Sequence, residues 1–306
     1  MSMKLKLIRP FLQRSSLVIG VAAALLCSCA PAEDPREYLF LGHPYDWGDP
    51  DRVDPRLERL DYGPYHQIWL GGDVCARTGQ TPGNLEYLDR LFDFRRTHWA
   101  LGNHDYYGFG DPDAILARLE RPAFYAVWVD GFCLLVLNTN LFFFYDAVPP
   151  QENCAEKAAQ LDLIRQVTDT IREASHLVVL HHHGLFNELK LDAQGAVIEA
   201  FNVNSQHIYA TCDADSELGK VVYPRLAAVQ QRGVQVVLIG GDVGMQAKTF
   251  EYQTPEGIWL LGSGINNSVS REHAPEYVKD FSPDQVLRLA YYPASRRLEW
   301  EFVLLD

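Results

Sequence analysis

Two stretches decide the fold of this chain, Trp69-Leu-Gly-Gly-Asp73 and Leu101-Gly-Asn-His-Asp105. In each, a short apolar run ends in glycine and is followed at once by carboxylate, amide or imidazole side chains. This pattern is typical of a buried β-strand with functional groups at its carboxyl end. Because side chains from several strand ends meet at one edge of an open α/β sheet, we expect the two stretches to lie together.

Three further segments follow the same rule, Gly42-His-Pro-Tyr-Asp46, His181-His-His183 and Gly240-Gly-Asp-Val-Gly244. A turn or cap role explains Asp or Asn at any single strand end. The same coincidence would have to hold at several strand ends for that reading to account for the whole pattern. The five segments together therefore predict one site.

The rest of the chain predicts an α/β fold. Helical spacing separates the apolar runs and is clearest in 155–174, where Leu161, Ile164, Val167 and Ile171 recur at three- and four-residue intervals. The apolar runs themselves are 38–41, 67–70, 98–101, 132–137, 176–180, 234–239 and 258–261.

The C-terminus reads as a β-hairpin, because 285–292 and 297–304 alternate in polarity and flank Pro293-Ala-Ser-Arg296. A hairpin there predicts a second sheet packed on the first. The expected architecture is a four-layer sandwich, with two mixed β-sheets face to face and helices on the outside. The polar stretch from Gly184 to about Lys220 is long for a connection, and we expect a functional insertion over the site.

The N-terminus predicts export. Four basic residues precede the apolar run 16–26, which is too short to be a convincing membrane span. We expect a signal peptide at 1–28, a tether at 29–36 and one domain at 37–306. Leu26-Cys-Ser-Cys29 resembles a lipobox, which predicts a lipid on Cys29 and an outer-membrane-anchored lipoprotein. The alternative is ordinary cleavage after Ala30 or Ala32 and a periplasmic protein.

The net charge of the chain limits the kinds of partner that it can bind. Removal of residues 1–28 takes away four of the 27 basic residues and none of the 40 acidic ones, leaving a formal net charge of −17. Such a surface repels nucleic-acid polymers.

An oxidising compartment permits disulfides, and Cys154 with Cys212 is the expected pair because both stand in polar segments. Cys133 lies in an apolar run, which predicts a buried thiol.

The order of the five segments resembles the calcineurin-like metallophosphoesterases, whose pattern runs Asp-x-His, Gly-Asp, Gly-Asn-His-Asp/Glu, His and Gly-His-x-His. The resemblance covers about residues 38–265. It implies that Asp73 bridges two metals and that Asn103 and His181 bind one of them. It also implies that His104 contacts the phosphate or protonates the leaving group, and that Asp105 orients His104. Phosphate ester cleavage needs such cations and a positioned acid.

The first and last segments depart from the family pattern. His43, Tyr45 and Asp46 stand where Asp-x-His is expected, and Asp242 and Gly244 stand where the family has histidines. Asp46 is equally a turn residue. Asp73, Asn103, His181 and Asp242 would complete one tight site, and a second site near His43 and Tyr45 would be weaker because glycine offers no ligand. The donor types suit Mn, Fe or Zn, with Mg and Ca as further candidates.

The sequence offers three candidate substrate contacts, each with an alternative role. Arg77 either binds phosphate or pairs with surface acids, and His182 and His207 either contact substrate or face solvent. A weaker similarity links Leu137-Asn-Thr-Asn-Leu141 and the helix around Gln160 to acid sphingomyelinase-like phosphodiesterases. It favours a small phosphodiester or nucleotide-like substrate, although a phosphomonoester remains possible.

Two functions from different classes fit the sequence. The first is a metal-dependent hydrolase that uses a metal-activated water, with His104 as acid or phosphate contact. The second is a non-catalytic binding protein on the same scaffold with a degenerate metal site. The intact Gly-Asn-His-Asp segment favours the enzyme. No protein partner can be inferred.

Overall fold

The computed structural model describes residues 33–106, 108–144, 153–184, 209–210, 221–242, 248–265, 271–274 and 280–306. Within it, Asp34–Asp306 form one compact unit. The expected signal peptide, residues 29–32 of the tether and most of the insertion after Gly184 lie outside the described residues. In the part of the chain that is described, no helix is long and apolar enough to cross a membrane.

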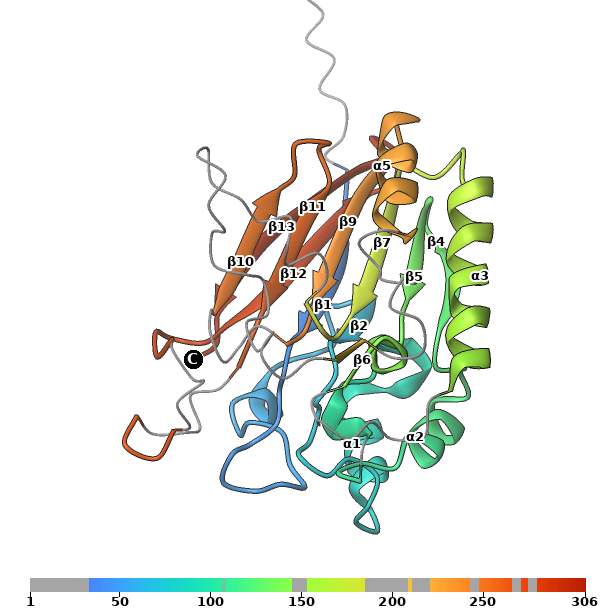
Figure 1. The fold of residues 1–306 in the computed structure, drawn as a ribbon. Helices are drawn as coiled ribbons and strands as arrows, with labels where there is room; N and C mark the ends of the chain where they lie inside the picture. The colour runs from blue at the N-terminus through green and yellow to red at the C-terminus, as the bar shows by residue number, and fades with distance from the viewer. Residues whose placement is uncertain are drawn as a thin grey trace, which may run out of the picture. The chain divides into compact units, whose positions relative to one another are not determined.

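The first sheet has five strands in the order β13-β12-β1-β2-β3 (Figure 1). Its parallel part is β1, β2 and β3, and β12 and β13 extend it as an antiparallel hairpin. The strands span Arg36–Leu41 (β1), Gln67–Leu70 (β2), Thr97–Trp99 (β3), Gln285–Tyr292 (β12) and Arg297–Leu304 (β13).

The second sheet has six strands in the order β10-β11-β9-β7-β5-β4, and its two edge strands run antiparallel to their neighbours. The four central strands are parallel. The strands span Tyr125–Val129 (β4), Phe132–Val136 (β5), His176–His181 (β7), Gln235–Gly240 (β9), Thr249–Gln253 (β10) and Trp259–Ser263 (β11). A separate two-stranded sheet pairs β6 (Phe143–Phe144) with β8 (Tyr209–Ala210).

The helices cover the outer faces. α1 (Asn84–Phe92) and α2 (Pro112–Leu119) lie on the side of the five-stranded sheet, and α3 (Cys154–Thr170) and α5 (Tyr223–Gln231) lie on the six-stranded sheet (Figure 1). α3 begins where Asn153 accepts a hydrogen bond from the Glu156 N–H at 3.2 Å. This is an N-cap that satisfies one of the free amides of the first turn.

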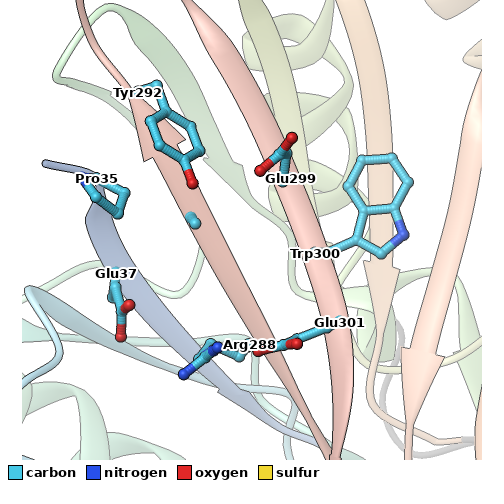
Figure 2. Close-up of a pocket in the computed structure, with 8 residues that line it drawn as sticks. Pro35, Glu37, Arg288, Tyr292, Glu299, Trp300 and Glu301 are labelled. Carbon is cyan, nitrogen blue, oxygen red and sulfur yellow. Dashed lines mark ion pairs between the residues drawn. The ribbon is translucent and has the colours of Figure 1, made fainter. Parts of the chain in front are cut away.

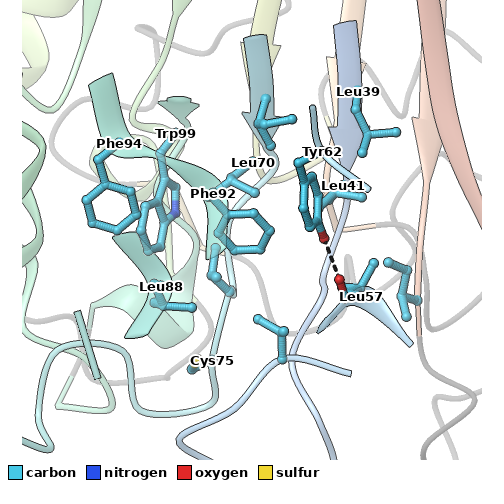
Figure 3. Close-up of a cluster of buried hydrophobic side chains, with 14 of the residues drawn as sticks. Leu39, Leu41, Leu57, Tyr62, Leu70, Cys75, Leu88, Phe92, Phe94 and Trp99 are labelled. Atoms are coloured by element: carbon cyan, nitrogen blue, oxygen red, sulfur yellow. Dashed lines mark hydrogen bonds between the residues drawn. The ribbon is translucent and has the colours of Figure 1, made fainter. Parts of the chain in front are cut away.

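Three apolar clusters correspond to the three interfaces between four layers. One lies between α3, α5 and the six-stranded sheet, one between the two sheets, and one between the five-stranded sheet and α1, α2 and the loop after β1. Figure 3 draws the last of these, in which the buried Tyr62 hydroxyl donates to the Leu57 carbonyl at 2.9 Å. The predicted four-layer sandwich of two mixed sheets is confirmed, as is the C-terminal hairpin.

The carboxyl ends of the two sheets meet at glycines. A Cβ on Gly241, after β9, would lie 1.9 Å from the carbonyl oxygen of Gly71, after β2. No side chain fits there, so the absence of a Cβ allows the two backbones to approach each other. This close approach brings the strand-end residues of both sheets into one place.

The cysteines follow the sequence prediction in part. Cys75 and Cys133 are buried and free. Cys154 is disulfide-bonded, and its predicted partner Cys212 lies outside the described residues. The pairing itself remains a prediction.

Candidate functional site

The site lies where the parallel strands of both sheets end. His43 follows β1, Asp73 follows β2, and Asn103–Asp105 form a short 3-10 helix after β3. From the other sheet, His182 follows β7 and Asp242 follows β9. The close approach of the two sheets brings the side chains of His43, Asp73, Asn103 and His182 together.

Asp73 is the centre of this group and is 1% exposed. Its Oδ1 accepts the backbone N–H of His104 at 2.8 Å. Its Oδ2 lies 3.6 Å from His43 Nε2 and 3.5 Å from His182 Nε2. Burial alone would raise the pKa of Asp73, but the neighbouring His182, His104 and His43 outweigh burial and lower it. The carboxylate is therefore held in its ionised form between two imidazoles.

The backbone at this centre is strained. Asp73 and His43 both have a φ of 52°, in the left-handed region that non-glycine residues avoid. Such conformations cost free energy and persist where the surrounding structure imposes them, which is most often at functional sites. Here they turn both side chains toward each other.

The surroundings of the His182 ring favour a bound cation. Its Nδ1–H donates to the Gly71 carbonyl at 2.6 Å, so the Nε2 of the neutral ring carries a lone pair. That Nε2 faces two acceptors, Asn103 Oδ1 at 3.1 Å and Asp73 Oδ2 at 3.5 Å. Burial would lower the pKa of His182, but Asp73 and Asp242 outweigh burial and raise it. Three lone pairs converge, and only a proton or a metal cation satisfies them.

The structure places His182, and not the predicted ligand His181, beside Asp73. Side chains alternate along β7: Leu177 and Val179 face the helices, and Val178 and Leu180 face the other sheet. His181 continues the helix side and donates from Nδ1 to the His183 carbonyl at 2.8 Å. His182 continues the side that faces Asp73.

His43 is a buried imidazole beside Asp73. It is 3% exposed, and burial lowers its pKa to about 3, so the ring is neutral and able to bind a metal at physiological pH. Its Nδ1 has no hydrogen-bond partner among the described residues. The ring of Tyr45 lies 4.4 Å from it, centroid to centroid. Asp46 has the turn role that the sequence left open, because its Oδ1 accepts the Gly48 N–H at 2.8 Å.

His104 stands beside Asp73, to which its backbone N–H donates. Its Nδ1 lies 3.3 Å from the Ala76 carbonyl, to which an Nδ1–H would donate, leaving Nε2 for a substrate. Two aromatic rings flank the imidazole, Tyr45 at 5.5 Å and Phe109 at 4.8 Å between centroids. The backbone hydrogen bond to Asp73 fixes its distance from the centre of the site.

Asp105 does not orient the His104 ring, contrary to the sequence expectation. Its carboxylate is fully buried and accepts the backbone N–H groups of Asp73 at 3.0 Å and Gly102 at 2.9 Å, together with the Thr78 hydroxyl at 2.7 Å. Burial, followed by the charge of Asp73, raises its pKa to about 6. Asp105 therefore ties the segment after β2 to the segment after β3.

A second set of supporting residues was not assigned a role from sequence. The amide of Asn140 donates to the carbonyls of Leu101 at 2.9 Å and Gly102 at 3.2 Å. Gln160 of α3 exchanges two hydrogen bonds with the backbone of Asn138, at 2.7 and 3.0 Å. The Leu137–Leu141 motif was visible in the sequence, but its role as a brace for the Gly-Asn-His-Asp turn depends on contacts across the fold.

Other predicted site residues lie elsewhere or beyond description. Arg77 is exposed, its backbone N–H bonds to the Pro50 carbonyl at 3.1 Å, and the structure gives its side chain no contact with the described site residues. Asp242 lies beside His182 and donates its N–H to the carbonyl of that residue at 3.0 Å. His207 and Gly244 lie outside the described residues.

A hollow on the surface is separate from this site (Figure 2). It lies on the outer face of β1, β12 and β13, near Pro35 and Glu37 at the amino end of β1, whereas the site follows the carboxyl ends. Its remaining lining residues are Arg288, Ala290, Tyr292, Glu299, Trp300 and Glu301. Within the hollow, Arg288 forms an ion pair with Glu301.

The donor set fits a metal cation. Among the described residues, no three His, Cys, Asp or Glu side chains by themselves form a metal-binding group. The amide oxygen of Asn103, which lies 3.1 Å from His182 Nε2, adds an oxygen donor beside Asp73 and His182. A carboxylate, an amide oxygen and neutral imidazoles are the ligands that Mn, Fe and Zn accept.

Comparison with known proteins agrees with this geometry. The chain belongs to the calcineurin-like phosphoesterase family, because the model of that family matches residues 43–210, more than half of the chain. No curated protein matches it. The family is one of metal-dependent phosphoester hydrolysis, and the matched range contains the site residues from His43 to His182.

Proposed function

We propose that this chain is a metal-dependent phosphoesterase that hydrolyses a small phosphodiester or phosphomonoester, with His104 as the acid or phosphate contact. The observation that carries the proposal is the convergence of lone pairs at His182 Nε2, Asn103 Oδ1 and Asp73 Oδ2. Such a set is stable only around a positive charge. The imidazole of His104 next to it supplies the acid that ester cleavage needs.

Asp73, Asn103 and His182, with Asp242 close by, would hold the tight metal, and His43 with Asp73 would hold a weaker one. When bound, divalent cations neutralise phosphoryl oxygens and lower the pKa of water. His43 contributes a neutral ring because burial keeps it unprotonated. Asp105 and Asn140 keep Asn103 and His104 in register with Asp73 through their bonds to the Gly102 backbone.

His104 would act on the leaving group. In its imidazolium form, one N–H is directed to the Ala76 carbonyl, and the other remains for an ester oxygen. As water forms a new bond to phosphorus, the bond between phosphorus and the leaving oxygen would break, and the proton would pass from His104 Nε2 to that oxygen. The backbone bond from His104 to Asp73 keeps this donor beside the metal ligands.

Activity and metal analysis together test the proposal. The purified domain would be stripped with a chelator, reloaded with Mn, Fe, Zn, Mg or Ca in turn, and assayed with p-nitrophenyl phosphate and bis(p-nitrophenyl) phosphate. We expect metal-dependent release of nitrophenol from at least one. Tight metal binding without hydrolysis of either would instead support the non-catalytic binding protein.

We also propose that the enzyme acts outside the cytoplasm, tethered by a lipid on Cys29. The signal-like N-terminus supports this, as does the disulfide at Cys154, since disulfides persist in oxidising compartments. In cells, Cys29→Ser should move the protein from the membrane fraction to the soluble fraction. Continued membrane association of that variant would contradict the lipid anchor.

A further inference from the structure

An exposed phenylalanine stands beside the proposed acid. The side chain of Phe109 is 48% exposed, and its ring lies 4.8 Å from that of His104 at an interplanar angle of 36°. Among the described residues, the other large apolar side chains with comparable exposure are Trp128, Val303 and Leu304. Those three stand on β4 and β13, so Phe109 is the member of this group that adjoins the site.

The backbone holds Phe109 in this position. Its N–H donates to the Tyr106 carbonyl at 3.0 Å, and the N–H of Gly110 donates to the same oxygen at 3.3 Å. A Cβ on Gly110 would lie 2.5 Å from the carbonyl carbon of Asp105. The turn therefore packs closely against the segment that carries Asn103 and His104, which places Phe109 beside the acid.

Phe109 belongs to an aromatic wall formed by Tyr45, Trp47 and Phe109. The Tyr45 ring lies 5.5 Å from that of His104, and the Trp47 ring lies 5.5 Å from that of Tyr45, between centroids. Tyr45 is buried, with 6% exposure. Of Tyr45 and Phe109, the two wall residues whose rings lie next to His104, Phe109 is thus the one that is accessible to a ligand.

We propose that Phe109 binds the leaving group of the substrate and that this group is aromatic or apolar. The inference rests on the proposed function. A leaving oxygen that takes a proton from His104 must lie against the His104 imidazole, so the group attached to that oxygen lies next to Phe109. Stacked aromatic pairs gain stability beyond their buried area. A strongly hydrated leaving group would gain nothing from this surface and would lose water on reaching it.

The alternative is that Phe109 only shields His104 from water. The two roles predict different effects of removing the Phe109 side chain. A side chain that only shields His104 protects it whatever ester is bound, so its loss weakens the binding of all ligands, or slows the hydrolysis of all substrates, to the same extent. A leaving-group contact distinguishes ligands by their apolar part.

Ligand binding to the Mn-loaded protein tests the proposal without dependence on leaving-group chemistry. The probes are phenylphosphonate, methylphosphonate and inorganic phosphate, each measured by calorimetry. We expect the wild type to prefer phenylphosphonate over methylphosphonate by about threefold to tenfold. Phe109→Ala should reduce that ratio to about one and leave phosphate affinity unchanged, and Phe109→Leu should give an intermediate ratio. Trp128→Ala, which removes an aromatic exposed to 61% on β4, is the control and should keep the wild-type ratio.

The possible outcomes distinguish a failure of the role of Phe109 from a failure of the proposed function. An unchanged ratio in Phe109→Ala, an equal loss of affinity for all three ligands, or a wild type without preference would overturn the role of Phe109 alone. A wild type that binds none of the three and hydrolyses no ester would overturn the proposed function, and this inference with it.

Discussion

At the scale of single residues, the choice between His181 and His182 depends on the alternation of side chains along β7. His182 Nε2 lies 3.5 Å from Asp73 Oδ2, while His181 turns to the helix side. We predict that His182→Ala abolishes tight metal binding and that His181→Ala retains it. Metal content after dialysis, measured for both variants, is the test. Retention of the metal by His182→Ala would show that the ligands lie elsewhere.

His104 has a different role, and its substitution should separate chemistry from metal binding. The side chain lies beside the ligand group, and its link to Asp73 runs through the backbone N–H, which alanine keeps. His104→Ala should therefore lower turnover by about 10²–10⁴-fold with metal content unchanged. Steady-state assays with parallel metal analysis would show this. Undiminished turnover would remove His104 from the mechanism, and lost metal would make it a ligand.

His98 predicts a pH dependence that is independent of the metal site. Its Nδ1 lies 2.8 Å from the Tyr125 hydroxyl, and burial, then Arg121, lowers its pKa to about 3. The unfolded state takes up the proton near pH 6.5 and the folded state only near pH 3. The free energy of unfolding therefore decreases as the pH is lowered from about 6.5 to about 3, by up to about 1.4 kcal/mol per pH unit for this group.

His98→Gln should make that dependence shallower, because glutamine can still bond Tyr125 but does not titrate. Denaturant unfolding of both proteins between pH 7 and about pH 4 measures the two slopes. Equal slopes would mean that His98 is protonated in the folded state or that its contribution is masked.

At the scale of elements, the contact between β2 and β9 is set by backbone approach. A methyl group on Gly241 would lie 1.9 Å from the Gly71 carbonyl oxygen, so Gly241→Ala must push the two strand ends apart. We expect a loss of about 1–3 kcal/mol in the free energy of unfolding, as in overpacked cores, and weaker metal binding because Asp73 and Asp242 follow these strands.

Gly48→Ala is the matched control for this substitution. A Cβ on Gly48 would have Asp46 Oδ1 as its nearest neighbour at 3.4 Å, an ordinary contact. That variant should unfold within about 0.5 kcal/mol of the wild type. If both variants behaved like the wild type, the close approach of the strand ends would not be needed for the site.

At the scale of the whole molecule, the metal should act as a structural link between the two sheets. Asp73 and Asn103 follow strands of the five-stranded sheet, and His182 follows a strand of the six-stranded sheet. A ligand that binds only the folded state stabilises it, by about 2.7 kcal/mol at a hundredfold excess over the Kd. We predict one tight and one loose metal per chain.

Thermal unfolding with increasing metal measures this stabilisation. The melting temperature should rise as the tight site fills, and His182→Ala should remove most of the rise. A melting temperature that is indifferent to metal and chelator alike would contradict a site that joins the two sheets.

The sequence by itself determined the layer architecture, the strand ends that carry chemistry and the family. These follow from local patterns, because apolar runs, helical spacing and strand-end motifs are written in consecutive residues. The motif after β3 and the aspartate after β2 could be assigned to one site for the same reason: parallel strands of a sheet bring their carboxyl ends to a common edge.

Only the tertiary structure decided which atoms face one another. Three consecutive histidines look alike in sequence, and which of them faces Asp73 depends on which side of the sheet each position of β7 takes in the folded chain. Asp105 was expected to orient a side chain, yet it accepts N–H groups from Asp73 and Gly102, which belong to segments about 30 residues apart. Phe109 lies beside His104 because the turn that carries it packs closely against the segment after β3. These are relations between distant segments, and their distances are fixed by the packing of two sheets, which no local pattern encodes.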